Sequence, residues 1–189
     1  MAAPIGVGLT VDDLDRFPDD GVRRELIGGR LYVSAAPLPR HGRVVLRVGR
    51  IFLDYEEMNG GVAIEGPGVR YSTQDSIEPD VVYVAADAVP RPGERFVNPI
   101  VAVEVSSPST RWVDLNEKRP LLESHGLPEF WFVDLRADRV EVYRLGDDDR
   151  YGPPVIVERG GVISPPCMPG LDAAVDAILG PPEPQAGPS

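Results

Sequence analysis

Short, valine-rich segments separated by glycine or proline constrain the fold of this chain more than any other feature. Four such segments lie at residues 62–65, 68–71, 79–84 and 100–106. β-Branched residues bounded by turn residues are typical of strands. Before them, residues 40–58 carry apolar side chains at helical spacing, among them Val44, Val48 and Phe52. The combination predicts a mixed α/β fold of the α+β kind, with a central mixed sheet flanked by helices.

The remaining segments complete the predicted order of elements. They are a short helix over residues 10–17, a hairpin over 24–34, a helix over 107–125, a hairpin over 130–145, a weaker strand pair around Val155 and Val162, and a helix over 171–179. Pro120 falls inside the helix predicted over residues 107–125, where it removes a backbone donor and bends the helix. We expect a single domain over residues 9–179, preceded by a flexible segment 1–8 and followed by a disordered Pro-rich tail 180–189.

Composition narrows the functional classes. The 189 residues carry a formal net charge of −11, which disfavours broad, nonspecific nucleic-acid binding but allows a local basic groove. No apolar stretch approaches the roughly 18 residues of a membrane span, so no membrane partner is predicted. The single Cys167 has no partner for an internal disulfide, and the first residues lack a secretory signal pattern. We therefore expect a cytoplasmic protein.

One lysine and two carboxylates stand out. Eighteen of the nineteen basic residues are arginine, and the exception is Lys118. Glu104 is the only acidic residue in the apolar run 100–105, and Asp80 begins a neighbouring apolar segment. A carboxylate in an apolar strand is costly to bury unless it is paired or binds a metal. The three residues therefore indicate either a site for Mg²⁺ (or Mn²⁺), completed by substrate phosphates, or a structural salt bridge between Glu104 and Lys118 or an arginine.

The same residues resemble those of a known family. Segments that resemble the Uma-type family of bacterial restriction endonucleases lie at residues 24–32, 78–84, 101–110, 114–118 and 126–134. The resemblance covers about residues 9–178, and its most specific part is the string Glu-Val-Ser-Ser-Pro-Ser-Thr at 104–110. That family belongs to the PD-(D/E)XK nuclease superfamily. The resemblance therefore implies a restriction-endonuclease-like fold that hydrolyses phosphodiester bonds, with DNA as substrate.

The resemblance also assigns roles to the conspicuous residues. It implies that Asp80 and Glu104 are the motif carboxylates and metal ligands, and that the backbone carbonyl of Val105 adds a further ligand. The superfamily's usual lysine would lie two residues after the glutamate, where this chain has Ser106. The family resembles variants in which the lysine lies on the following helix, so Lys118 is expected to assist the attack of water.

Glu25 matches a further family glutamate that is expected to tune the acidic cluster. An alternative hypothesis, from a different functional class, is that the domain keeps the nuclease fold but is catalytically inactive and acts as a partner-binding or regulatory module. The two hypotheses differ in whether Asp80, Glu104 and Lys118 converge on one cavity. The sequence does not specify the oligomeric state, and a homodimer stays open.

A row of basic residues on the long predicted helix is the remaining candidate for substrate binding. Four arginines share one helical face: Arg40, Arg43, Arg47 and Arg50. Such a row is most often the solvated side of a helix, but guanidinium groups at helical pitch can also contact successive phosphates of a DNA duplex. His41 adjoins this face and His125 ends the helix that carries the lysine, so either could contact substrate.

Overall fold

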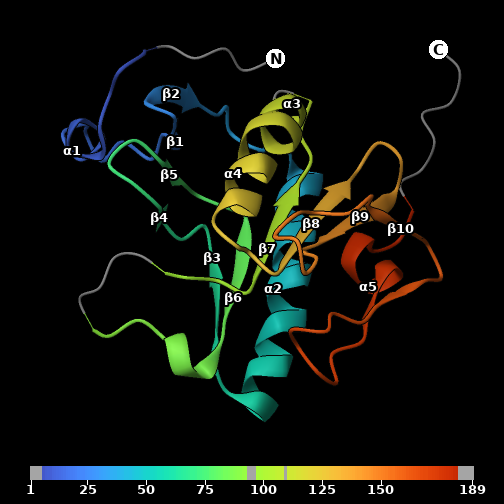
Figure 1. Ribbon diagram of the computed structural model, residues 1–189. Coiled ribbons are helices and arrows are strands. Elements are labelled where there is room, and N and C mark those ends of the chain that lie inside the picture. Colours follow the sequence, from blue (N-terminus) through green and yellow to red (C-terminus); the bar gives the residue numbers. More distant parts are fainter. Residues whose placement is uncertain (1–5, 93–96, 109, 183–189) are drawn as a thin grey trace, which may run out of the picture.

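The computed structural model describes residues 6–92, 97–108 and 110–182 (Figure 1). The elements, in chain order, are α1 (Val11–Leu14), β1 (Arg24–Ile27), β2 (Arg30–Val33), α2 (Pro39–Asn59), β3 (Val62–Glu65), β4 (Val69–Arg70), β5 (Ser76–Ile77), β6 (Val81–Val84), the 3₁₀ turn η1 (Ala86–Ala88), β7 (Val101–Val105), α3 (Arg111–Val113), the π-helical turn η2 (Asp114–Lys118), α4 (Arg119–Ser124), β8 (Glu129–Asp134), β9 (Arg139–Arg144), β10 (Val155–Glu158), β11 (Val162–Ile163), β12 (Ala173–Ala174) and α5 (Val175–Leu179). Most of the segment expected to be flexible at the N-terminus (1–5), and of the Pro-rich tail (183–189), lies outside the described residues.

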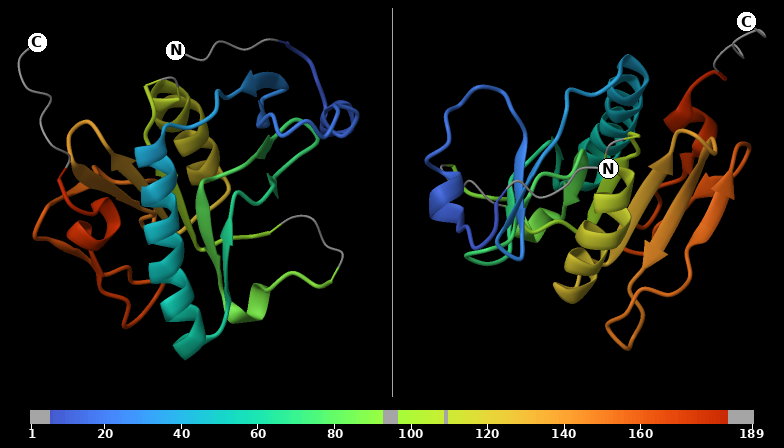
Figure 2. Two further views of the ribbon diagram at one scale, coloured as in Figure 1. Left: turned by 180° about the vertical axis from the view of Figure 1, so that it is seen from behind. Right: turned by 90° about the horizontal axis from the view of Figure 1, so that it is seen from above.

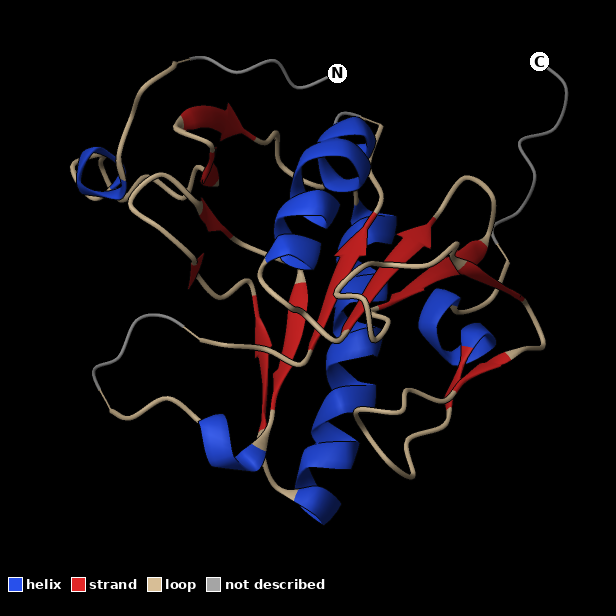
Figure 3. Cartoon of the chain, viewed as in Figure 1, coloured by secondary structure: helices blue, strands red, loops and turns tan. Residues whose placement is uncertain are grey.

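A six-stranded sheet forms the centre of the molecule. Its strand order is β10-β9-β8-β7-β6-β3. β7 and β8 run parallel, and every other neighbouring pair is antiparallel. The parallel pair is joined by the crossover α3-η2-α4, which packs on one face of the sheet, while α2 lies on the opposite face (Figures 1 and 3). The predicted central mixed sheet flanked by helices is confirmed.

The core on the α2 side follows from the apolar stripe of that helix. Val44, Val48 and Phe52 are buried against the sheet. The Phe52 ring meets Tyr83 and Trp131 edge-on, with ring centroids 5.9 and 5.5 Å away. Such contacts add to the free energy gained by burying the rings. Although α2 has 21 residues, no helix in the described ranges is both long and apolar enough to cross a membrane.

A smaller four-stranded sheet, in the order β2-β1-β5-β4, packs beside the central one. The predicted hairpin is present as β1 and β2, with Leu26 paired to Leu31. β5 was not predicted, because its two residues give no alternation that a pattern could reveal. It pairs with β1 at Leu26 and Ser76, so β1 is held from both sides.

Several predicted boundaries differ from the structure. The first helix ends at Leu14, and the helix expected from Ser107 begins only at Arg111. Val155 and Val162 do not pair with each other, because β10 pairs with β9 and β11 pairs with β12. The final helix begins at Val175, after the short strand β12.

Candidate active site

Asp80 and Glu104 lie opposite each other at one end of the central sheet. Antiparallel pairing aligns Val82 of β6 with Ala102 of β7, and two more residues along each strand bring Asp80 opposite Glu104. Side chains two residues apart share a face of a strand, so both carboxylates lie on the α3-α4 side. The Val105 N–H donates a hydrogen bond of 2.7 Å to Asp80 Oδ2, which fixes that carboxylate.

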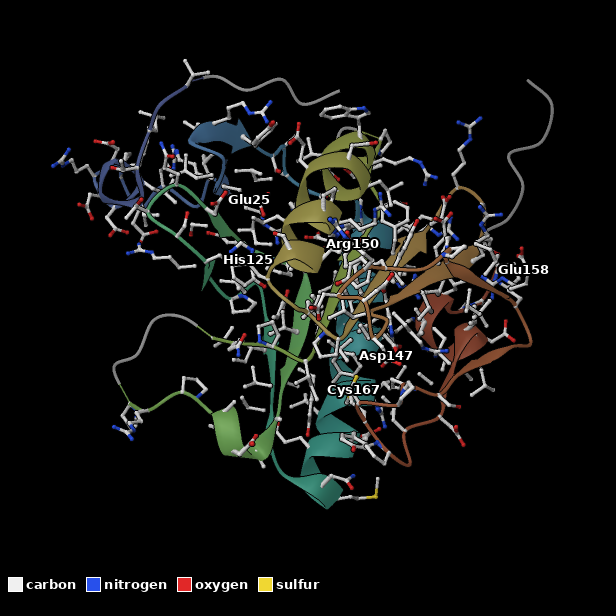
Figure 4. All side chains as sticks on the ribbon, viewed as in Figure 1. Glu25, His125, Asp147, Arg150, Glu158 and Cys167 are labelled. Carbon is white, nitrogen blue, oxygen red and sulfur yellow. The ribbon has the colours of Figure 1, made fainter. Side chains whose placement is uncertain are left out.

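Lys118 projects from η2 into a group of three buried carboxylates. Its Nζ lies 2.8 Å from Glu25 Oε1, 2.9 Å from Glu104 Oε1 and 3.3 Å from Asp114 Oδ1. All four side chains are at most 3% exposed. Glu25 on β1 lies beside the helical segment that carries Lys118 (Figure 4). The salt bridge between Glu104 and Lys118 is therefore present, within the predicted cluster.

Asp80 has two nitrogen partners of its own. Arg23 Nη1 donates to Asp80 Oδ1 at 2.7 Å, and His41 Nε2 lies 3.1 Å from Oδ2. Arg23 Nε also lies 3.6 Å from Glu78, whose backbone N–H donates to Glu25 Oε1 at 2.8 Å. Arg23 and Glu78 thus connect the aspartate to the lysine group. His41, which the sequence left as a residue that could contact substrate, is buried against Asp80.

Burial and charge act oppositely on the two motif carboxylates. Burial alone would raise the pKa of Asp80, but the His41 hydrogen bond and the Arg23 charge outweigh it and hold that pKa well below its ordinary value. Burial raises the pKa of Glu104 well above its ordinary value, and the charge of Lys118 offsets only part of this effect. Asp80 is therefore the member of the pair that stays ionised to the lower pH.

The lysine and its second helical neighbour are perturbed as well. Burial would lower the pKa of Lys118, but the negative charges of Glu104, Glu25 and Asp114 hold it well above its ordinary value. Burial raises the pKa of Asp114 to about 6, against the opposing effect of Lys118. The ammonium group of Lys118 consequently stays charged at neutral pH, and it is the shared partner of the three surrounding carboxylates.

Ser106 occupies the position of the superfamily's usual lysine. Its Oγ accepts a 2.9 Å hydrogen bond from the Leu135 N–H and is buried. A hydroxyl held in this way supplies no positive charge. Lys118 brings an ammonium group to Glu104 from the crossover helix instead.

A cavity of about 510 Å³ opens onto this cluster. Its lining includes Arg23, His41, Asp80, Glu104, Asp114 and Lys118. Asp80, Glu104 and Lys118 therefore converge on one cavity, as the nuclease hypothesis requires. Glu25 is joined to them through Lys118.

The donor set at this cavity fits a hard divalent cation. Among the described residues, no group of three or more carboxylate, histidine or cysteine side chains is arranged to hold a metal ion. Mg²⁺ does not need such a group, because it commonly takes one or two protein carboxylates and completes its shell with water and phosphate oxygens. Asp80 and Glu104 supply that number. Together with Asp80 and Glu104, the carboxylates of Glu25 and Asp114 outnumber the cationic side chains of Lys118 and Arg23, which further favours a cation.

The four helix arginines do not form one uniform exposed row. Arg40 donates to the Leu135 carbonyl at 2.7 Å and to Asp138 at 2.6 Å. The Arg47 side chain lies against Gly180. Arg43 and Arg50 are exposed. Binding of DNA by this face stays a prediction.

Two site residues were missed by the sequence reasoning. Arg23 gives no local signal, because it precedes a strand in a chain rich in arginine and acquires its partner only in the folded structure. Asp114 lies four residues before Lys118, a spacing that places both on one helical face. That spacing was a readable signal. His125, by contrast, stacks on Tyr71 with ring centroids 4.3 Å apart and does not line the cavity.

Comparison with known proteins agrees with the fold. The model of the Uma2 family, described as "Putative restriction endonuclease", matches residues 11–176. Among solved structures, the chain is similar to a protein from Anabaena variabilis described as a putative nuclease belonging to DUF820. That similarity has a TM-score of 0.74 and 18% sequence identity, over 90% of this chain and 97% of the other. The comparison with curated proteins finds no match.

Proposed function

The chain belongs to the Uma2 family, and from this membership and the geometry of the cavity we propose that it is a metal-dependent nuclease that hydrolyses phosphodiester bonds in DNA. The observation that carries the proposal is the placement of Asp80 and Glu104 opposite each other, with Lys118 Nζ 2.9 Å from Glu104. A structural salt bridge alone would need neither the second carboxylate nor the cavity.

Asp80 and Glu104 would hold Mg²⁺ or Mn²⁺, with the Val105 carbonyl as the further ligand that the family resemblance implies. When bound, the ion stabilises negative charge on the phosphoryl oxygens and lowers the pKa of a bound water. The Val105 N–H holds Asp80 in a fixed orientation. Low pKa keeps Asp80 ionised and able to bind a cation across the neutral range.

Lys118 would supply the positive charge that faces the reacting phosphate. A charged donor placed where negative charge develops stabilises the transition state, and removal of such a donor commonly reduces the rate by about 10²–10³-fold. Glu25 and Asp114 keep the ammonium charged and fix its position. These two acids are positioning residues, since they act through the lysine.

One observation favours a second candidate, the inactive nuclease-fold module. Each motif carboxylate already has a protein partner of opposite charge, since Arg23 pairs with Asp80 and Lys118 with Glu104. Buried ion pairs that satisfy one another in this way can contribute to the stability of the fold or to the specificity of folding without any role in catalysis. In that case the buried charges would persist without a metal.

Cleavage of DNA separates the two candidates. Purified protein is incubated with supercoiled and linear DNA in the presence of Mg²⁺, Mn²⁺ or EDTA, and products are resolved by electrophoresis. We expect cleavage that requires the metal and is lost in Asp80→Asn and Glu104→Gln. Glu123→Gln is the matched control, because Glu123 is a carboxylate paired with Arg150 outside the cavity. Cleavage that is equal in all four proteins, or absent with every metal and DNA form, contradicts the proposal.

A further inference from the structure

The outer face of α2 carries a regular stripe that the active site does not use. Exposed residues recur at spacings of three and four: Arg43, Leu46, Arg50, Leu53 and Glu57. Leu46 is 66% exposed and Leu53 is 50% exposed, although both lie within a helix whose other face packs on the sheet. Of the elements in the described part of the chain, none covers this side of α2 when the molecule is seen from behind (Figure 2, left).

The spacing is that of a helix–helix seam. Alternating steps of three and four residues keep side chains on one line of an α-helix, as in coiled coils. Gly42 and Gly49 lie beside this line, and the lack of side chains there allows another helix to approach closely. Single exposed leucines are common and need no explanation. Two leucines seven residues apart, with glycines beside them, describe a surface suited to another helix.

The charges along α2 select the partner. Its first half carries Arg43 and Arg47, Arg50 lies one residue past the middle and 3.9 Å from Asp54 of the same helix, and its last turns carry Glu57. A second copy of α2 placed antiparallel sets each basic half against an acidic half, and it also opposes the helix dipoles favourably. A parallel arrangement would set like charges against each other. The face is therefore complementary to itself under a two-fold axis, the commonest symmetry of homo-oligomers.

We propose that the outer face of α2 is a homodimer interface in which two copies of this helix pack antiparallel. If the two-fold axis passes between residues 49 and 50, residue numbers that lie opposite each other in the two copies sum to 99. Leu46 of one copy therefore meets Leu53 of the other. Gly49 then faces Arg50 and leaves room for its long side chain. Arg43 comes to the level of residue 56, one residue from Glu57.

Duplex DNA fits this face less well. Phosphates would gain from Arg43 and Arg50, but Leu46 and Leu53 between them offer no contact to a phosphate. The acidic end of the helix would repel the backbone. We therefore expect Arg43 to pair with Glu57 of a second copy, while Arg50 stays beside Asp54 of its own helix.

The expected affinity is modest. A helix of 21 residues is about 31 Å long and about 10 Å wide, which gives a contact face of roughly 300 Å². That is below the ~800 Å² per partner of a standard interface. Association should therefore be weak, with a dissociation constant in the micromolar range or above.

Sedimentation equilibrium on the full chain, without metal or DNA, tests the interface. Loading concentrations from about 10 to about 500 μM bracket the expected affinity. The mass of the wild type should rise with concentration from the 20.5 kDa of one chain towards twice that value. Leu46→Lys/Leu53→Lys should keep the mass of one chain throughout. Met58→Lys is the control, because Met58 is 77% exposed on the same helix but off the seam.

Charge exchange sharpens the test. Arg43→Glu alone should weaken association at least about tenfold, equivalent to ~1.4 kcal/mol, and Arg43→Glu/Glu57→Arg should restore it because each contact again joins opposite charges. A wild type that stays at one-chain mass, or a dimer that survives Leu46→Lys/Leu53→Lys, overturns the proposal. DNA binding that falls in Arg43→Glu and rises in Leu46→Lys, by a protein of one-chain mass, would assign the face to nucleic acid instead. The outcome does not depend on nuclease activity.

Discussion

Replacement of Asp114 by asparagine is expected to stabilise the folded chain at neutral pH. Asp114 is 1% exposed, and burial raises its pKa from 3.8 to about 6 although Lys118 opposes the change. Between these two values the folded state binds more protons at this site than the unfolded state. Stability therefore falls as pH rises through that window, and the loss persists at higher pH.

The size of the effect follows from the same values. The difference of 6 − 3.8 = 2.2 pH units, at about 1.36 kcal/mol each, sets an upper limit of ~3 kcal/mol. Glu104, whose pKa the charge of Asp114 helps to raise, adjusts its own protonation in the variant. We therefore expect a gain of about 1–3 kcal/mol at about pH 7.5, and almost none at about pH 4.

Urea unfolding of wild type and Asp114→Asn at the two pH values measures this gain. The exposed Asp87 provides a matched control, since Asp87→Asn makes the same chemical change outside the cluster. A gain of equal size at both pH values would show that titration of Asp114 is not its cause. Destabilisation at neutral pH would refute the reasoning, because it would mean that Lys118 needs all three of its carboxylates.

Three other substitutions test the lysine, the metal ligands and the core. Lys118→Arg should reduce DNA cleavage about a hundredfold or more in a steady-state assay, because the planar guanidinium cannot replace a compact ammonium held by three acids; full activity would remove the lysine from the mechanism. Mg²⁺ or Mn²⁺ should raise the melting temperature of the wild type, and the rise should vanish in Glu104→Gln; an equal rise in both would place the metal elsewhere. Phe52→Ala should lower the unfolding free energy by about 3–5 kcal/mol in urea titration, because Phe52 is fully buried between Tyr83 and Trp131; a loss below about 1 kcal/mol would mean that the core refills the cavity.

The sequence predicted the parts of the site that local chemistry makes conspicuous. Glu104 was recognisable because it interrupts an apolar strand, and Lys118 because it is the only lysine. The fold class followed from alternating helical and strand patterns, whose periods are properties of the backbone. Arg23 and His41 were not assigned their contacts with Asp80, since those contacts join segments 57 and 39 residues apart. Only the folded sheet brings such segments together.

The crossover between β7 and β8 shows why local periodicity failed closest to the site. Pro120 has no N–H to donate within a regular helix, and the preceding residues form the wider turn η2, in which the Arg119 N–H donates to the Asp114 carbonyl. Side chains supplement the backbone bonds here, since Asn116 donates to the Trp112 carbonyl and the Arg119 side chain to the Leu115 carbonyl.

The wider turn carries both Asp114 and Lys118, the two residues that the crossover contributes to the buried cluster. Single π-type turns within α-helices occur frequently at functional sites. A helical pattern would have placed these residues at regular α-helical positions from Ser107 to His125 and would have missed the turn. The backbone departs from regular α-helix geometry at the place where two charged side chains are buried together. Such a departure is expected where the requirements of a functional site, and not the stability of the helix, determine the backbone conformation.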